Sequence, residues 1–293
     1  ITKSMTATLA ATMVEDGLIQ WETTLGSVFP EKVGAMSGEW ANVTLKQLLA
    51  NASGAPNNLN SSGIWNTLWN FNGLPRDGRL LLLDELTPQP LRFAPATGYE
   101  YSNAGFALAG LMLEEVANST WEDLMRERLF EPLGMKSGGF GVPATPRHLD
   151  HPVGHGGTVG NPTIFDPAAN ADNPPAIGPA ATAHASILDL ARYAQAHLRG
   201  DREGGPVLPK ATWEFLHTQA FGNSYALGWN VLNRSWAGGD ALTHTGSNTQ
   251  WYTNIWIAPE VNWACIVCTN FGGTNAFQMT DQVILWAINN HGP

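Results

Sequence analysis

The first stretch of the chain is apolar on nearly every side. Met5, Leu9 and Met13 stand four residues apart, and alanine and threonine fill most positions between them. A helix that is apolar around its whole circumference belongs in a protein interior. Residues 1–14 therefore predict a central, buried helix that stops at Asp16-Gly17. Because a buried helix rarely opens a natural protein, we expect the chain to be part of a longer polypeptide or to have a companion chain.

Helical signals continue through the first two thirds of the chain. Apolar residues recur at helical spacing, and several stretches begin with Ser or Thr followed three residues later by an acidic residue or Gln, which caps a helix. The predicted helices cover residues 43–51, 102–118, 119–131, 186–199 and 210–219. Residues 138–179 are rich in Gly, Pro, Asn and His and predict a long loop.

The pattern changes after residue 224. Residues 225–232, 250–258 and 263–270 predict strands separated by turns, and residues 278–289 predict a closing amphipathic helix. We expect an α+β protein with a mostly helical region at residues 1–185 and an antiparallel sheet flanked by helices at residues 186–293. The two regions are expected to pack as one unit.

Both cysteines fall in the last predicted strand. Cys265 and Cys268 are three residues apart, so their side chains would point to opposite faces of the sheet. A redox C-x-x-C pair is expected at the start of a helix instead. We therefore predict two core thiols and no disulfide framework.

Composition excludes several classes of protein. Of 293 residues, 43% are hydrophobic and only 14% are charged, which excludes a disordered chain. The formal net charge of −10 argues against a nucleic-acid partner. No apolar run approaches the ~18 residues of a membrane-spanning helix, so no membrane span is expected.

Lys3 is the first residue with candidate chemistry. It lies one turn into the predicted buried helix, where an ammonium group is costly unless it has a function or partners. Burial would lower its pKa and suit the amine to act as a general base. The alternative is an exposed lysine at a frayed chain end.

A second candidate cluster is Tyr101-Ser102-Asn103, at the start of the predicted helix 102–118. A Tyr hydroxyl and an Asn amide at such a junction can face a cleft. The alternative is a helix N-cap at Ser102 or Asn103 beside a packed Tyr.

The third cluster is His244-Thr245-Gly246-Ser247, at the start of the sheet region. Gly246 would let a ligand approach the backbone closely, and an exposed strand edge can donate N–H groups to an oxyanion. The alternative is an ordinary turn with a hydrogen-bonded His.

Together, the three clusters resemble the motifs of the active-site serine penicillin-recognising hydrolases. Lys3, Tyr101-x-Asn103 and His244-Thr245-Gly246 follow in that family's order, separated by roughly 100 and 140 residues. The family comprises class C β-lactamases, DD-carboxypeptidases, D-aminopeptidases and related esterases. Residues 44–54, 93–103, 131–135 and 225–229 also resemble its characteristic stretches, with Asn51 in place of the usual His.

The resemblance implies a β-lactamase/transpeptidase-like fold and a nucleophilic Ser. Ile1-Thr2-Lys3 is similar to the last three residues of the motif Ser-x-x-Lys, so the Ser would directly precede Ile1. The family also places its first strands before that Ser, so a segment outside this chain would complete the sheet. Cleavage beside the Ser, a separate preceding chain, or loss of a modified Ser from the sequence would each account for this start.

The resemblance also implies roles for the motif residues. Lys3 would take the Ser proton, and Tyr101 would pass a proton to the leaving group and later activate water. Asn103 would bind an amide of the acyl group, and the backbone N–H of Ser247 would help form the oxyanion hole along the Gly246 edge. No metal or organic cofactor is implied.

Other residues bear on specificity. His244 and Thr245 would bind the leaving side or a substrate carboxylate, but β-lactamases have Lys where His244 stands. Histidine attracts a carboxylate less strongly at neutral pH. Trp251, with Trp65 and Trp69, is a candidate to line an apolar substrate cleft, and the alternative is ordinary packing.

The predicted function is a serine hydrolase that forms an acyl-enzyme on a D-amino-acid peptide, amide or ester, with weak or no antibiotic hydrolysis. Three alternatives stay open: a true β-lactamase, a non-catalytic binding or sensor protein on the same scaffold, and a precursor whose cleavage changes its activity. The expected partner is a small-molecule or peptide substrate. The resemblance favours a periplasmic or secreted protein.

Overall fold

The predicted central helix is confirmed. The computed structural model describes residues 1–148, 150–167 and 172–292, and helix α1 spans Thr2–Glu15. Every α1 residue as far as Met13 is buried, including its threonines. The hydroxyl of Thr6, for example, donates to the backbone oxygen of Pro179 at 2.6 Å. Polar groups inside this helix thus keep hydrogen-bond partners, which burial requires.

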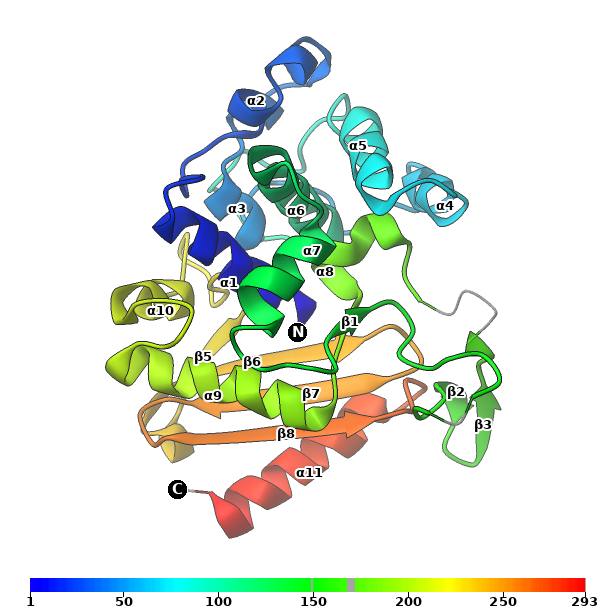
Figure 1. Ribbon diagram of the computed structural model, residues 1–293, viewed down its shortest axis with the longest axis vertical. Coiled ribbons are helices and arrows are strands. Elements are labelled where there is room, and N and C mark those ends of the chain that lie inside the picture. The colour runs from blue at the N-terminus through cyan, green and yellow to red at the C-terminus, as the bar shows by residue number, and fades with distance from the viewer. Residues whose placement is uncertain (149, 168–171, 293) are drawn as a thin grey trace.

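Most helices of the first two thirds of the chain gather at one end of the molecule. Figure 1 shows them above the sheet, with α1 lying between these helices and the sheet. They are α2 (Leu25–Val28), α3 (Leu45–Leu49), α4 (Ile64–Trp69), α5 (Pro75–Leu86), α6 (Asn103–Ala117), α7 (Trp121–Met125) and α8 (Gly178–Ala181). Helix α6 is the apolar helix predicted at residues 102–118, and most of its residues are buried.

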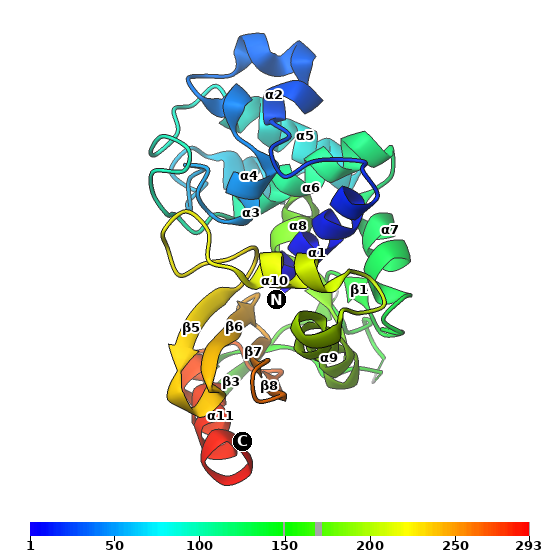
Figure 2. The same ribbon diagram turned by 90° about the vertical axis from the view of Figure 1, so that its left-hand side faces the viewer.

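An antiparallel sheet forms the other end. Its strands β5 (Asn230–Arg234), β6 (Gly239–Ser247), β7 (Tyr252–Ala258) and β8 (Trp263–Thr269) are neighbours in that order. Helix α9 (Ile187–Glu203) packs on one face and α11 (Ala276–His291) on the other, and α10 (Lys210–His217) packs on α9 (Figure 2). The predicted α+β class, an antiparallel sheet with helices, is confirmed.

The strand predicted at residues 225–232 begins later, at Asn230. Gly228 has a φ of 82°, and the N–H of Ala226 bonds the oxygen of Trp229 in the turn around it. A Cβ atom on Gly228 would lie 2.5 Å from the Cα atom of Ser4. Glycine is therefore needed here for both its φ and its small size, because the segment crosses directly over the start of α1.

The long loop predicted at residues 138–179 is only partly a loop. It contains β1 (Gly139–Phe140), which pairs with β4 (Ala183–His184), and the antiparallel pair β2 (His155–Thr158) and β3 (Asn161–Ile164). These strands have two to four residues, too short for the alternating pattern that identifies a strand in a sequence.

The prediction of two core thiols is wrong. Cys265 is half-buried and Cys268 is exposed, and both are free. Their strand, β8, is an edge strand of the sheet that the structure describes, with a paired strand on one side only. Apolar neighbours in the sequence signalled a buried strand but did not show that it stands at the edge.

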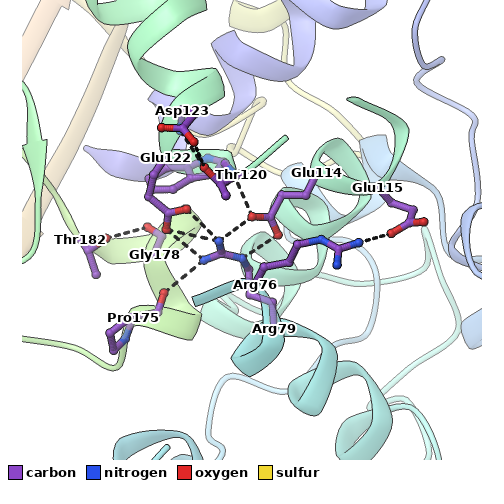
Figure 3. Close-up of polar contacts among 11 residues, drawn as sticks. Arg76, Arg79, Glu114, Glu115, Thr120, Glu122, Asp123, Pro175, Gly178 and Thr182 are labelled. Carbon is purple, nitrogen blue, oxygen red and sulfur yellow. Dashed lines mark hydrogen bonds and ion pairs between the residues drawn. The ribbon is translucent and has the colours of Figure 1, made fainter. Parts of the chain in front are cut away.

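A buried arginine joins several helices. The Arg79 side chain of α5 is fully buried and pairs with Glu114 of α6 at 2.6 Å and with Glu122 of α7 at 3.0 Å (Figure 3). Its Nη1 also donates to the backbone oxygen of Pro175 at 3.2 Å. This network fixes the segment that leads into α8, a helix that contacts α1.

One main hydrophobic core runs through both ends of the molecule. It includes Met5 of α1, Leu111 of α6, Trp213 of α10 and Ile257 of β7. The boundary expected at residues 185 and 186 thus separates two regions that share a core. Their definition as separate domains stays a prediction.

Candidate active site

The Lys3 amine is held in the interior at the start of α1. Its side chain is buried, and Nζ donates to Asn103 Oδ1 at 2.6 Å and to the backbone oxygen of Ala180 at 3.1 Å. The Tyr101 ring lies beside it, with its centroid 4.4 Å from Nζ. The alternative of an exposed, frayed lysine therefore does not hold. Three separate parts of the chain position this amine.

The environment of Lys3 favours its neutral form. Burial lowers the pKa of the amine to about 7. Both of its hydrogen-bond acceptors are uncharged, and no carboxylate in the described part of the chain pairs with it. An acidic partner would stabilise the ammonium and raise the pKa again. At neutral pH a substantial fraction of Lys3 is therefore free to accept a proton.

The start of α6 explains why Asn103 can reach Lys3. Ser102 is the N-cap, and its hydroxyl accepts the N–H of Gly105 at 3.0 Å and donates to the oxygen of Pro56 at 2.7 Å. The backbone N–H of Ser102 donates to Asn51 Oδ1 at 2.9 Å. The helix-cap alternative thus holds for Ser102 but not for Asn103, whose side chain is free to bind the amine.

Tyr101 stands between the lysine and the sheet. Its ring centroid lies 6.2 Å from that of His244 and 6.3 Å, edge-on, from that of Tyr225. The side chain is 39% exposed, so a ligand can reach it. Partial burial removes water from the phenol, and Tyr99 lies nearby; both effects raise the pKa of the phenol. The phenol is therefore protonated at neutral pH and can donate a hydrogen bond.

Strand β6 brings its glycine against the start of α1. A Cβ atom built on Gly246 would lie 3.4 Å from the backbone nitrogen of Ile1. The β6 backbone pairs with β7 here, with Gly246 opposite Thr253. The absence of a side chain leaves the backbone open beside the helix terminus, where N–H groups carry partial positive charge.

His244 is buried and its ring is engaged on both sides. Nδ1 lies 2.5 Å from the backbone oxygen of Thr245, and Nε2 lies 3.1 Å from the Tyr225 hydroxyl. A carbonyl oxygen can only accept, so Nδ1 carries the proton and Nε2 accepts from Tyr225. Burial lowers the pKa of His244 well below its ordinary value, and Lys3 lowers it further. The ring is neutral at pH 7.

Ser247 and Trp251 lie at the end of β6, at the turn into β7. The hydroxyl of Ser247 accepts the N–H of Thr249 at 3.0 Å, and Asn248 Oδ1 accepts the N–H of Trp251 at 3.1 Å. The Trp251 indole is half-buried and donates to the oxygen of Pro152 at 3.2 Å. It stands close in sequence to Gly246, but no recorded contact joins it to Lys3. Its place in a substrate cleft stays a prediction.

Three groups of this cluster were not foreseen. Tyr225 was noted only as part of the stretch at residues 225–229, Asn51 only as a replacement for His, and Ala180 not at all. The signal for Tyr225 was a tyrosine in a resembling stretch, and the signal for Asn51 was its departure from the usual residue. The residue type does not show whether a backbone oxygen, such as that of Ala180, accepts a hydrogen bond from a side chain.

None of the described helices is long and apolar enough to cross a membrane. In the ranges that the structure describes, no group of three or more His, Cys, Asp or Glu side chains could hold a metal ion.

Comparison with known proteins shows the family of the chain. The family model described as Beta-lactamase matches residues 1–287. Penicillin-binding protein 4 of Amycolatopsis lactamdurans is 24% identical over 94% of the chain, which spans 72% of that protein. The chain spans only about half the length of other curated relatives.

Solved structures share the fold. SurE superposes with a TM-score of 0.77 at 20% identity, covering 98% of this chain and 62% of that one. The D-amino acid amidase of Ochrobactrum anthropi SV3 superposes with a TM-score of 0.74 at 20% identity, covering 99% of this chain and 83% of that one. The family match extends over nearly the whole sequence, so the chain belongs to the β-lactamase family of serine hydrolases.

Proposed function

We propose that the protein containing this chain hydrolyses amides or esters of amino acids through an acyl-enzyme. One observation carries the proposal: a buried lysine amine lies between Asn103 and Tyr101, at the helix end that faces Gly246, and no carboxylate of the described residues pairs with it. The nucleophile would be a Ser hydroxyl directly before Ile1, supplied by a longer polypeptide or a companion chain.

The position of Lys3 suits proton transfer from such a hydroxyl. Residues three apart on a helix lie on the same face, so a Ser before Ile1 would stand over the Lys3 amine. The neutral amine takes the hydroxyl proton while the oxygen attacks the substrate carbonyl carbon. When the bond to the leaving nitrogen or oxygen breaks, the leaving group takes up that proton. Water then hydrolyses the acyl-enzyme ester and restores the Ser.

Tyr101 and the strand edge complete the proposed site. The Tyr101 phenol is protonated at neutral pH and stands beside Lys3, so it can relay the proton to the leaving group. The negative oxygen that forms on the substrate would face the N-terminus of α1 and the N–H of Ser247. Helix-end and strand N–H groups stabilise such an oxyanion without having to reorient.

His244 supports a substrate without a carboxylate on the leaving side. A lysine or a charged histidine would attract such a group, but the buried ring is neutral and both its nitrogens are engaged. This favours amides and esters over penicillins and cephalosporins, whose ring carboxylate needs a cation. The name of the amidase with the same fold, a D-amino acid amidase, supports the same class.

Turnover of three substrates by the full natural protein tests the proposal. We expect measurable hydrolysis of a D-amino-acid p-nitroanilide and a short p-nitrophenyl ester, and slow hydrolysis of a chromogenic cephalosporin. A fluorophosphonate should add its mass to a Ser that directly precedes Ile1, as read by intact-mass and peptide analysis. Absence of both labelling and turnover would instead indicate a binding protein on this scaffold. Rapid cephalosporin hydrolysis would indicate a true β-lactamase.

A further inference from the structure

Asp172 is a buried carboxylate near the candidate site that the proposed mechanism does not use. The residue is 8% exposed, and burial raises the pKa of its carboxyl to about 6. In the described part of the chain, no Lys, Arg or His forms an ion pair with it. A buried carboxylate without a cation is costly, because it loses its hydration without gaining an opposite charge.

The hydrogen bonds of Asp172 do not require its charge. Oδ1 accepts the backbone N–H of Asn173 at 2.7 Å, the side-chain amide of Asn248 at 3.1 Å and, at 3.4 Å, the side-chain amide of Asn173. The amide oxygen of an asparagine could accept the same bonds. No hydrogen bond to Oδ2 is recorded from the residues that the structure describes. Among the residues that the structure describes, the second oxygen and the charge therefore have no structural partner.

The carboxylate is hydrogen-bonded to the turn that follows the proposed oxyanion donor. Asn248 follows Ser247, the proposed oxyanion donor, and its Cα atom stands within about 7.6 Å of that of Gly246 because only two peptide units separate them. Asn248 Oδ1 accepts the N–H of Trp251, so a hydrogen-bonded turn holds the Asn248 side chain toward Asp172. His244 lies farther back along the strand, on the side assigned to the leaving group.

The segment after Asp172 is also anchored to the site. Arg79 donates a hydrogen bond to the backbone oxygen of Pro175. The backbone oxygen of Ala180, in α8, accepts a hydrogen bond from the Lys3 amine. Asp172 is thus fixed at one end of a short segment whose other end touches Lys3. A carboxylate held in this way is positioned before any ligand arrives.

Resting on the proposed function, we propose that Asp172 binds the ammonium group carried by the acyl part of the substrate, so that the enzyme selects amino-acid amides and esters with a free amine. Oδ2 would accept the ammonium hydrogen bond while Oδ1 keeps its bonds to Asn173 and Asn248.

Paired substrates test this subsite. For the full natural protein, kcat/KM should be at least about tenfold higher for D-phenylalanine p-nitroanilide than for its N-acetyl derivative, mainly through KM, because a desolvated ion pair contributes that much discrimination. Asp172→Asn keeps the Oδ1 acceptor and removes only the charge. It should lower this ratio about tenfold, whereas Glu260→Gln, at an exposed turn, should leave it unchanged.

The pH dependence in the unaltered protein gives a second test that needs no variant. Asp172 ionises as the pH rises through about 6, while the substrate amine stays protonated to higher pH. The preference for the free amine should therefore grow between pH 5 and 7. A ratio that does not change with pH, or that Asp172→Asn leaves intact, would overturn the subsite while leaving the proposed function in place.

Ligand binding separates the two proposals. Calorimetry with D-phenylalaninamide and its N-acetyl derivative requires no turnover. Tighter binding of the free amine that Asp172→Asn abolishes supports the subsite even if neither hydrolysis nor fluorophosphonate labelling is found, which would contradict only the proposed function. Equal binding of the two ligands would overturn the subsite.

Discussion

At the scale of single residues, the protein treats two buried cations in opposite ways. Arg79 is surrounded by carboxylates, and Glu114 and Glu122 keep it charged. In the described part of the chain, the hydrogen-bond acceptors of Lys3 are one amide oxygen and one backbone oxygen, both uncharged, and burial lowers the pKa of its amine to about 7. The first arrangement stabilises a charge for structural reasons. The second keeps an amine able to gain and lose a proton, which general base catalysis requires.

The lowered pKa of Lys3 predicts the pH dependence of the reaction. The neutral amine is the base, so kcat/KM for a p-nitrophenyl ester should rise as the pH increases through about 7 and then level off. The same shift affects stability. The folded chain binds fewer protons at Lys3 than the unfolded chain, so the free energy of unfolding should increase between about pH 7 and 10, as measured by urea denaturation.

Replacing the lysine should separate its chemical role from its packing role. Lys3→Met keeps the length of the side chain and removes the amine. We expect kcat/KM to fall by about 10²–10⁴-fold, the usual contribution of a general base, with little loss of stability. Lys136→Met, at an exposed lysine, is the matched control. An active Lys3→Met protein would contradict the proposed role.

At the scale of elements, turns and helix ends place the candidate groups. The N-cap at Ser102 sets the first turn of α6, so that Tyr101 and Asn103 face Lys3 from either side of the cap. Asn51, which is buried just after the end of α3, also holds this turn, because its Oδ1 accepts the backbone N–H of Ser102. The start of α6 thus positions Tyr101 and Asn103, as the start of α1 positions Lys3.

Removing the cap should affect both stability and catalysis. Ser102→Ala loses the bonds to Gly105 and Pro56, and a lost N-cap costs about 1 kcal/mol of unfolding free energy. Because the same turn positions Tyr101 and Asn103, kcat should fall as well. Thr120→Ala, which removes the N-cap of α7 away from Lys3, should lower stability by a similar amount and leave kcat unchanged. Equal effects of both variants on kcat would contradict this role of the α6 cap.

At the scale of the whole molecule, a shared core and one ion-pair network hold the parts together. Helix α1 is buried between the helical layer and the sheet, so each side of the candidate site depends on the packing of the other (Figure 2). The Arg79 network joins α5, α6 and α7 to the segment that leads to α8 (Figure 3).

Breaking this network should be costly. Glu114→Gln leaves the fully buried Arg79 with one carboxylate, and removing one partner of a buried pair typically costs about 3–5 kcal/mol. Asp123→Asn, in an exposed pair with Arg126, should cost less than about 1 kcal/mol. Chemical denaturation of both variants measures the difference. Equal small losses would show that Arg79 finds other partners.

The sequence predicted many of the longer helices and strands, but it did not predict helix α5 (Pro75–Leu86) or the nine-residue strand β6 (Gly239–Ser247). The predicted ranges agree closely with helices α1, α6 and α9 and with strands β7 and β8. In each of these elements the apolar positions repeat over many residues. The short strands β1 to β3 and the late start of β5 were missed, since two to four residues carry no period and the turn at Gly228 depends on its contact with α1.

The candidate site was predictable only in part. Lys3, Tyr101, Asn103 and Gly246 were identified from a resemblance, and the structure gathers them around the start of α1. The engagement of His244 by Tyr225 could not be predicted, because it depends on which way a buried ring turns. Asp172 carried no signal at all, since a lone acidic residue in a loop-rich stretch gives no indication of its burial.

The crossing of Gly228 over Ser4 has a consequence for anyone who recombines this protein with its relatives. A chimera that exchanges residues 186–293 must bring a glycine to the same point, because any larger residue would push the exchanged half away from the helix that carries Lys3. In such a hybrid each half would still bury its own hydrophobic residues, but the sheet would no longer lie correctly against the start of α1. Libraries built from these halves should therefore be filtered first at position 228.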